Sequence, residues 1–306
     1  MKAKETNMPV HPPGRILLAT DLSHRTDRAL DRSVRLARDW GATLLVVHAI
    51  EQEVDDFYDP YPRLDRPLRR SDPAAEVRSR IARDLGDAAE TLDIQIHVEE
   101  GAPAEIVLRA AEQHAADLIV TGVARAETLG RLWLGSTVDR LARRSRIPLL
   151  IVRDRAFAPY PDIVVATDFA PPSRLALETA AAWFPDSRFH LFHGYDVPFA
   201  SYLGRAEINR QLESLGDEAV RDFLAGAELG RVDPERVQPL IEHGAPAALL
   251  RNFATGSRRH LVVVGSHGGG LVYEALIGST ARRIIDSVPG DVLLIPGRQA
   301  GEAATA

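Results

Sequence analysis

Short apolar runs alternate with amphipathic segments along the whole chain of 306 residues. Runs such as Thr43–Ala49 and His260–Gly265 are rich in valine, leucine and isoleucine, and polar connections separate them from segments with helical spacing. This alternation predicts βαβ units, in which helices cover both faces of a parallel sheet. The apolar runs are also far too short to cross a bilayer, so no membrane partner is expected.

The pattern predicts ten strands and eight helices. The strands are expected at Arg15–Ala19, Thr43–Ala49, Ile94–Glu99, Leu118–Val123, Pro148–Val152, Asp162–Ala166, Arg188–Gly194, Val237–Glu242, His260–Gly265 and Asp291–Pro296. The helices are expected at Thr26–Trp40, Pro73–Thr91, Pro103–His114, Ser136–Arg144, Ser173–Phe184, Glu207–Leu229, Pro246–Thr255 and Ser279–Val288. Three of them begin with a proline, which the first helical turn tolerates.

The two halves of the chain repeat each other. Four segments of the first half recur in the same order in the second: Ile16–Leu22 as Ile163–Phe169, Glu100–Ala104 as His243–Ala247, Leu118–Gly122 as Leu261–Gly265, and Leu134–Thr137 as Ile277–Thr280. An internal repeat of this length indicates two complete structural units. We therefore expect two α/β domains, at residues 13–153 and 161–297, joined by a short stretch with prolines and charges.

Composition excludes several classes of function. The net charge is −6 and no basic block is present, so nucleic acid is not expected as a partner. The chain has no cysteine, which excludes disulfides and, with no visible secretory signal, favours a cytoplasmic location. Lys2 and Lys4 are the only lysines, so mechanisms that need a lysine inside the fold, such as Walker-A phosphate loops, are excluded.

A glycine pattern follows the fourth strand of the second half. Gly265–Gly268 is separated by nine residues from Gly278–Thr280, which opens the last helix. In open parallel sheets, ligands bind beyond the carboxyl ends of the strands. Glycines let the backbone approach an anion, and the amides and hydroxyls at a helix start favour phosphate. The pattern therefore predicts a phosphate-binding loop.

An aspartate follows the first strand of each half, at Asp21 and Asp168. Such a carboxylate can accept hydrogen bonds from the hydroxyls or amine of a nucleoside. It can equally be a helix cap or a turn residue. Because Asp168 shares its half with the glycine pattern, we favour the ligand role there.

These residues resemble the universal stress protein family in its tandem form, over roughly residues 13 to 297. The family's ATP-binding members share Gly-x2-Gly-x9-Gly followed by Ser or Thr, which Gly265, Gly268, Gly278 and Ser279 match. The resemblance implies two doubly wound, Rossmann-like sheets of five parallel strands in the order 3-2-1-4-5. It also implies a cytosolic location and dimers formed through the last strand.

The resemblance further implies an adenine nucleotide as ligand: ATP, alone or with Mg²⁺. The phosphates would lie on the glycine loop and the start of the last helix, and the adenine beside Ala166, Thr167 and Phe189. The expected nucleotide-binding residues are Ala166, Thr167, Asp168, Phe189, Val264, Gly265, His267, Gly268, Gly278, Ser279 and Thr280.

The first half departs from the glycine pattern, because Arg125 replaces the second glycine. Its guanidinium could bind a phosphate directly, or its bulk could close the space that glycine leaves open. We favour the second interpretation. A weaker first-domain site would consist of Asp21, Gly122, Arg125, Gly135, Ser136 and Thr137.

Three functions remain open at this point. The first is an ATP-binding regulatory protein of the stress response, with at most weak hydrolysis and no assigned catalytic residue. The second is a phosphotransfer enzyme that uses Asp168, Mg²⁺ and Ser279 or Thr280. The third is a scaffold or small-molecule carrier. No metal site is assigned, although His193 with His243 or His267 is an alternative as a ligand set. His193 and His48 occupy matching positions in the two halves, which suggests a role in the fold.

The last strand of each half is short and apolar. Exposed edges of this kind invite association, so we expect the two edges of one chain to pair with each other. The nine residues Arg153–Pro161 can span about 30 Å at most, which suffices for adjacent edges. By the same reasoning, each half expressed alone would dimerise. Homodimers of the whole chain are left open.

Overall fold

The computed structural model describes residues 11–24, 26–51, 72–123, 134–156, 158–195, 218–256, 260–266 and 277–297. The first domain consists of β1 (Arg15–Thr20), α1 (Asp27–Trp40), β2 (Thr43–Ile50), α2 (Pro73–Leu85), α3 (Ala88–Thr91), β3 (Ile94–Glu100), α4 (Pro103–Gln113), β4 (Leu118–Gly122), α5 (Ser136–Arg144) and β5 (Leu149–Val152). The second consists of β6 (Asp162–Ala166), α6 (Pro171–Trp183), β7 (Arg188–Tyr195), a helical segment at 218–225, η1 (Pro234–Arg236), β8 (Val237–His243), α8 (Pro246–Gly256), β9 (His260–Gly265), α9 (Ser279–Ser287) and β10 (Asp291–Ile295).

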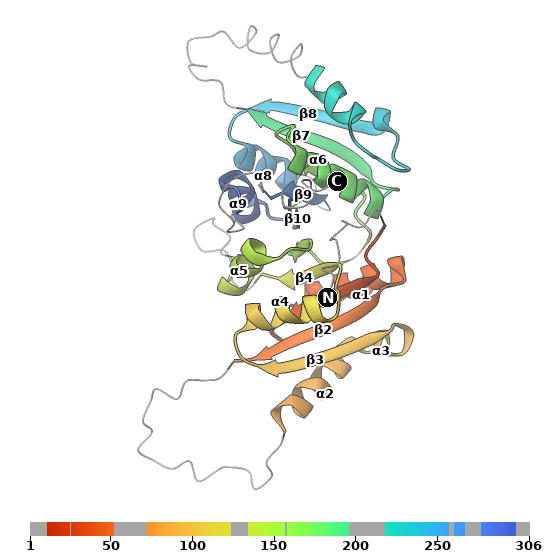
Figure 1. Cartoon of the computed structure of the whole chain (residues 1–306), viewed down its shortest axis with the longest axis vertical. Coiled ribbons are helices and arrows are strands. Elements are labelled where there is room, and N and C mark those ends of the chain that lie inside the picture. Colours follow the sequence, from red (N-terminus) through yellow and green to blue (C-terminus); the bar gives the residue numbers. More distant parts are fainter. Residues whose placement is uncertain are drawn as a thin grey trace, which may run out of the picture.

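The strands of both domains form one ten-stranded sheet in the order β3-β2-β1-β4-β5-β10-β9-β6-β7-β8 (Figure 1). Each domain is therefore a parallel sheet with the strand order 3-2-1-4-5, as the family resemblance implies. The two sheets join where β5 pairs antiparallel with β10.

Two predicted helices differ from the structure. The helix expected at Pro73–Thr91 is divided into α2 and α3, because Gly86 adopts a left-handed backbone with φ 49° and ends α2. Residues 207–217 of the helix expected at Glu207–Leu229 lie outside the described residues. The part that is described ends at residue 225, before Gly226 packs against the Arg174 guanidinium.

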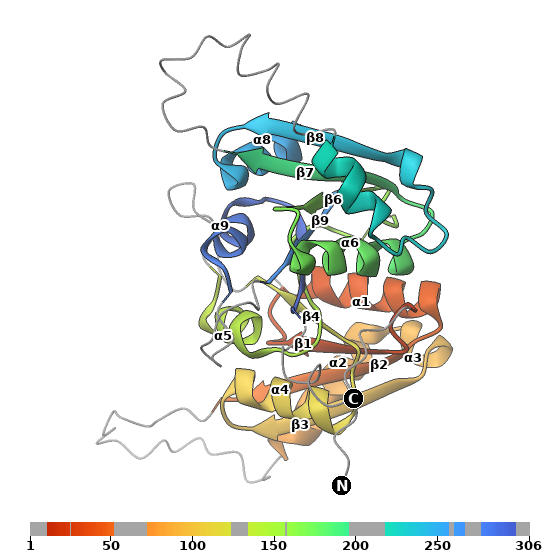
Figure 2. The ribbon, with the colours of Figure 1, turned by 45° about the horizontal axis from the view of Figure 1, so that its top comes forward.

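Helices cover both faces of the common sheet (Figure 2). One face is covered by α1, α2, α6 and the segment 218–225, and the other by α4, α5, α8 and α9. Each of the two apolar clusters between helices and sheet includes buried residues of both domains. The domains therefore share their cores, and the boundary between them is packed like an interior.

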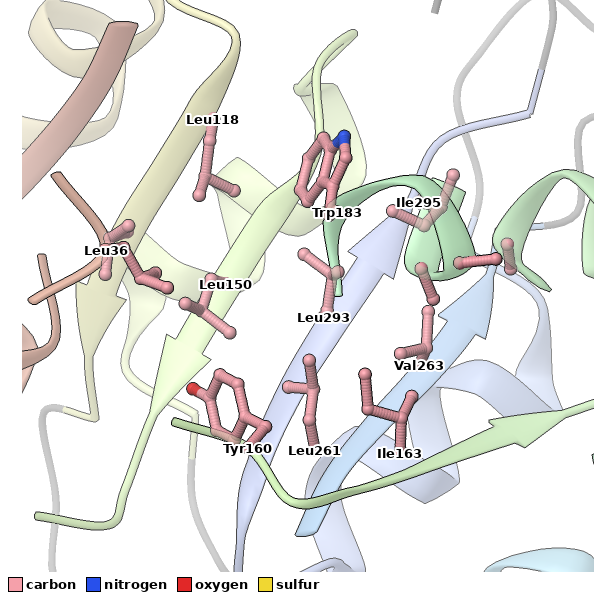
Figure 3. Packing of buried hydrophobic residues seen from close by; sticks show 14 of the residues in the cluster. Leu36, Leu118, Leu150, Tyr160, Ile163, Trp183, Leu261, Val263, Leu293 and Ile295 are labelled. Atoms are coloured by element: carbon pink, nitrogen blue, oxygen red, sulfur yellow. The ribbon is translucent and has the colours of Figure 1, made fainter. Parts of the chain in front are cut away.

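The strand junction is nearly symmetric. Leu150 pairs with Leu293, and these are corresponding positions of the two repeats. On either side, Ile151 pairs with Val292 and Leu149 with Leu294. All of these side chains are buried, and Figure 3 shows Leu150 and Leu293 within the shared cluster. A pseudo-twofold axis thus passes between Leu150 and Leu293.

Aromatic side chains extend this contact to the helices. Trp40 at the end of α1 lies edge-to-face against Trp183 of α6, with ring centroids 5.8 Å apart. Phe184 lies 5.5 Å from Trp40 and 5.6 Å from Tyr160 of the connecting segment. Edge-to-face pairs of this kind stabilise a contact beyond their buried area, and here they fix α1 against α6.

A buried polar network closes one end of the strand junction. Asp291 is fully buried and accepts hydrogen bonds from the backbone amides of Arg153 (2.7 Å) and Asp154 (2.9 Å) and from the Tyr160 hydroxyl (2.6 Å). The Arg32 guanidinium lies 3.5 Å from the same carboxylate and 4.1 Å from the centre of the Tyr160 ring. Since every oxygen of the carboxylate has a partner, its burial is tolerated.

Arg153 itself is buried beside this carboxylate. Its guanidinium donates to the carbonyl oxygens of Ile285 (2.7 Å) and Gly290 (3.2 Å). Burial lowers the pKa of Arg153 to about 10, against the opposing effect of Asp291. The network therefore connects α1, the interdomain segment and the start of β10.

We expect Leu150→Asp to destabilise both domains together. A carboxylate at the centre of the junction would be buried without donors, which should lower the free energy of unfolding by about 4 kcal/mol. Urea unfolding followed by circular dichroism measures this. Gln95→Asp, on the exposed side of β3, is the control and should change stability by less than about 0.5 kcal/mol. Two separate transitions, only one of them shifted, would contradict the shared core.

Candidate functional site

The same turn follows the first strand of each domain. In the second domain, the Thr167 hydroxyl accepts from the Phe169 amide (2.8 Å), and Asp168 Oδ1 accepts from the Ala170 amide (3.1 Å) and the Ser173 hydroxyl (3.0 Å). Thr20 and Asp21 make the matching bonds in the first domain. Although burial raises it, bonds from Ser23 and Thr26 hold the pKa of Asp21 below its usual value. Both aspartates therefore organise turns.

Each turn contains a bulky residue with a left-handed backbone. The φ angles are 57° at Leu22 and 60° at Phe169. This region is unfavourable for residues other than glycine, by roughly 1–3 kcal/mol, and it persists only where surrounding bonds hold it. The Thr-Asp hydrogen bonds provide that restraint. They present the turn at the carboxyl end of the sheet, where ligands of open α/β sheets bind.

A histidine fixes the turn from the neighbouring strand. His48 Nδ1 lies 2.9 Å from the Thr20 carbonyl oxygen, and His193 Nδ1 lies 2.8 Å from that of Thr167. Because a carbonyl only accepts, Nδ1 of each ring carries the proton. The expected fold role of these two histidines is confirmed. Among the residues that the structure describes, no three His, Asp or Glu side chains are arranged to hold a metal ion.

Gly265 is required by packing. A Cβ atom added to it would lie 2.5 Å from the Pro172 carbonyl oxygen and 2.8 Å from its carbon. The first turn of α6 therefore rests directly on the end of β9. Beyond Gly265, the Ser266 amide donates to the Ile295 carbonyl (2.8 Å), and its hydroxyl accepts from the Gly297 amide (3.0 Å). The first residues of the glycine loop are thus attached to β10.

The last helix of each domain begins after a glycine. Gly278 precedes α9 with φ −56° and ψ 147°, and Gly135 precedes α5 with φ −58° and ψ 156°. Glycine offers no side chain to cap the first amides, and within the described ranges no side chain caps either helix start, so these amides can donate to a ligand or water. Ser279 and Thr280 of the first turn of α9 are exposed.

The strand register brings most of the expected residues to one edge. Ala166 pairs with Val264, so Thr167 and Asp168 follow β6 where Gly265 ends β9. In the first domain Ala19 pairs with Thr121, so Asp21 follows β1 at the same edge of the sheet where Gly122 ends β4. His267, Gly268 and Arg125 lie outside the described residues.

The assignment of Phe189 is corrected by the register. Phe189 pairs with Ile163 near the amino ends of their strands and is 1% exposed in the core. Phe192, equally buried, is the residue opposite Ala166. Phe189 therefore lies at the wrong end of the sheet to contact a ligand beside Thr167.

Aromatic rings do gather at the carboxyl edge, and of these Phe169 and Tyr195 were not anticipated from the sequence. Phe169, His193, Tyr195 and His243 form a row of rings at the carboxyl ends of β6, β7 and β8, with successive centroids 4.7, 6.3 and 5.5 Å apart. The signal was available, since alternate residues of a strand share a face and His193 and Tyr195 are two apart. The corresponding first-domain residues are Leu22, His48, Ile50 and Glu100, a less aromatic set.

Comparison with known proteins agrees with this architecture. The profile of the Universal stress protein family matches residues 13–153 and 159–296. The chain belongs to the universal stress protein family. A universal stress protein of Mycolicibacterium smegmatis is 26% identical over 92% of this chain and 97% of its own length. One from Thermus aquaticus is 36% identical over 45% of this chain and 97% of its own length.

Solved structures share the tandem fold. A universal stress protein from Archaeoglobus fulgidus superposes with a TM-score of 0.63 at 21% identity, covering 92% of this chain and 98% of that one. A Pseudomonas aeruginosa protein described as functionally unknown superposes with a TM-score of 0.66 at 18% identity, covering 94% of both chains. Within the described parts of this universal stress protein, no helix has the length and apolar character of a membrane span.

We expect Gly265→Ala to destabilise the second domain. The Pro172 carbonyl would have to move away from the new methyl group, which should lower the free energy of unfolding by about 2 kcal/mol. Gly14→Ala is the matched control, because its Cβ would be 3.7 Å from the nearest atom, in ordinary contact. Equal unfolding midpoints for the two variants in urea would show that Gly265 is not sterically constrained.

Proposed function

We propose that this chain is an adenine-nucleotide-binding regulatory protein of the stress response, with ATP, alone or with Mg²⁺, bound by the second domain. The observation that carries the proposal is the convergence at one sheet edge of the Thr167–Asp168 turn, the end of β9 and the uncapped start of α9. These elements offer acceptors for a nucleoside and donors for its phosphates.

The phosphate side of the proposal rests on the direction of α9. This helix ends at Ser287, just before Asp291 opens β10 at the amino edge of the sheet. A helix of this length spans roughly 13 Å, so its start lies toward the carboxyl edge. There the free amides, the positive end of the helix dipole and the Ser279 and Thr280 hydroxyls favour a polyphosphate.

The nucleoside side rests on Asp168 and the aromatic row. A carboxylate has about four acceptor positions, so an Asp168 that organises the turn can still accept from a ribose hydroxyl. Phe169, His193, Tyr195 and His243 provide ring faces at the same edge of the sheet, and a purine stacks on such faces. The second domain is therefore better suited to a nucleotide than the first.

Regulation by binding is favoured over phosphotransfer. Lys2 and Lys4 are the only lysines and precede both domains in the sequence, so neither glycine motif contains a lysine. We infer at most slow hydrolysis of ATP. We also infer that the protein acts in the cytoplasm, because a chain without cysteines forms no disulfides and needs no oxidising compartment.

We expect Gly278→Val to weaken ATP binding at least about tenfold, or 1.4 kcal/mol. The φ of −56° at Gly278 is open to any residue, so valine fills the phosphate space without straining the backbone. Isothermal calorimetry with full-length protein measures the affinity. The matched control is Gly135→Val, the same change at the start of α5, which should leave the affinity unchanged. Weaker binding in Gly135→Val, with unchanged binding in Gly278→Val, would indicate that the nucleotide binds to the first domain instead.

We also expect one tightly bound adenine nucleotide per chain. The first domain lacks the second motif glycine and has fewer aromatic side chains at the corresponding edge. Mass spectrometry identifies the nucleotide that stays bound to the protein through purification. Calorimetric titration then gives the number of nucleotides bound per chain. Two sites of similar affinity would show that Arg125 is compatible with binding.

A further inference from the structure

Helices α5 and α9 carry opposite charges at corresponding positions of the repeat. Asp139 of α5 corresponds to Arg282 of α9, and Arg143 corresponds to Asp286. Across the pseudo-twofold axis, Arg282 forms an ion pair with Asp139. Within each helix, Arg143 lies 3.2 Å from Asp139, and Arg282 lies 3.0 Å from Asp286. The four charges therefore form an alternating row that spans both domains.

The buried network at the end of the strand junction is also one-sided. Asp291 and Arg153 correspond to Pro148 and Pro296 in the other repeat. Two of the donors to Asp291 are the backbone amides of Arg153 and Asp154. Proline has no amide hydrogen, so Pro296 could not donate in place of Arg153. Thr179, which corresponds to Arg32, uses its hydroxyl to bond the Leu175 carbonyl.

We propose that this junction is a heterotypic interface, on which each half of the chain recognises the other half and rejects a copy of itself. In a self-pair of second halves, Asp291 would keep the Tyr160 hydroxyl but lose the Arg153 and Asp154 amides and the Arg32 guanidinium, with Pro296 in place of Arg153, and Arg282 would face Arg282. In a self-pair of first halves, buried Arg153 would face Pro148 without a carboxylate, and Asp139 would face Asp139. Buried charges without partners and opposed like charges both act against the wrong pairs.

This chemistry argues against the expectation that each half expressed alone would dimerise through its last strand. The apolar strands are suited to either pairing, since Leu149–Ile151 and Val292–Leu294 are equally apolar. Selectivity therefore comes from the polar groups around the strands. It ensures that the domain with the intact glycine pattern is always joined to the domain with the altered one, whether within a chain or by exchange between two chains.

A charge-exchange experiment on the full chain tests the helix contact. The double variant Asp139→Arg with Arg143→Asp gives α5 the charge order of α9, and Arg282→Asp with Asp286→Arg does the reverse. Each exchange keeps the pair within its helix and the net charge of the chain. Each should lower the melting temperature by about 3 °C at low salt, and the combination of all four changes should restore it to within about 1 °C.

The thermodynamic cycle separates the contact between helices from effects on each helix alone. The part of the change in melting temperature that is not additive between the two exchanges should be smaller in 1 M salt. Salt screens these charges, because the Arg282 and Asp139 side chains are about one-third exposed. Arg283→Asp, at the exposed neighbouring position of α9, is the control and should show no coupling to the α5 exchange. Additive effects of the two exchanges would overturn the proposed role of these charges.

Partner choice is tested with a protease site inserted after Arg155, which is exposed in the interdomain segment. Isotopically heavy and light chains, cut in the native state, are mixed in urea and diluted. Native mass spectrometry should detect only pairs of a first half with a second half, in heavy and light combinations. Pairs of two first halves or two second halves, at more than about one-tenth of the total, would overturn the proposal.

Discussion

The antiparallel pairing of β5 with β10 is the contact on which the rest of the structure depends. Without this pairing, the last strand of each domain, β5 or β10, would be an open apolar edge, and such an edge attracts other chains. Joining the two edges satisfies their hydrogen bonds and makes one sheet with continuous cores on both faces. The helices α1 and α6 then meet through Trp40 and Trp183 beside the strand junction.

Around this apolar centre, polar groups determine which surfaces meet. Leucine against leucine at the pseudo-twofold axis does not distinguish one repeat from the other. The carboxylate of Asp291 does, because it needs the amide of Arg153, the hydroxyl of Tyr160 and the guanidinium of Arg32 at once. Burying a charge is unfavourable unless its partners are present, so the network stabilises one arrangement far more than its alternatives.

The proposed nucleotide edge is built from elements whose first role is in the fold. Gly265 admits the start of α6, Asp168 closes a turn, and His193 holds the carbonyl of Thr167. These contacts hold Phe169 in its left-handed backbone conformation and keep the row of aromatic rings at the carboxyl edge of the sheet. A site prepared in this way needs little rearrangement to accept a ligand, which favours binding. The first domain keeps the turn and the histidine but has aliphatic and acidic side chains where the second has rings.

The sequence by itself determined the local structure and the tandem plan. Hydrophobic alternation located all ten strands to within one or two residues, and the repeat with its Thr-Asp and glycine motifs indicated the family and the strand order. It misplaced Phe189 and overlooked Tyr195, because the face and end of a strand depend on its register against neighbours. Only the tertiary structure showed that Asp291 is buried and that Asp139 meets Arg282. Those relations join residues more than a hundred positions apart, and no local pattern encodes which distant charge will stand opposite.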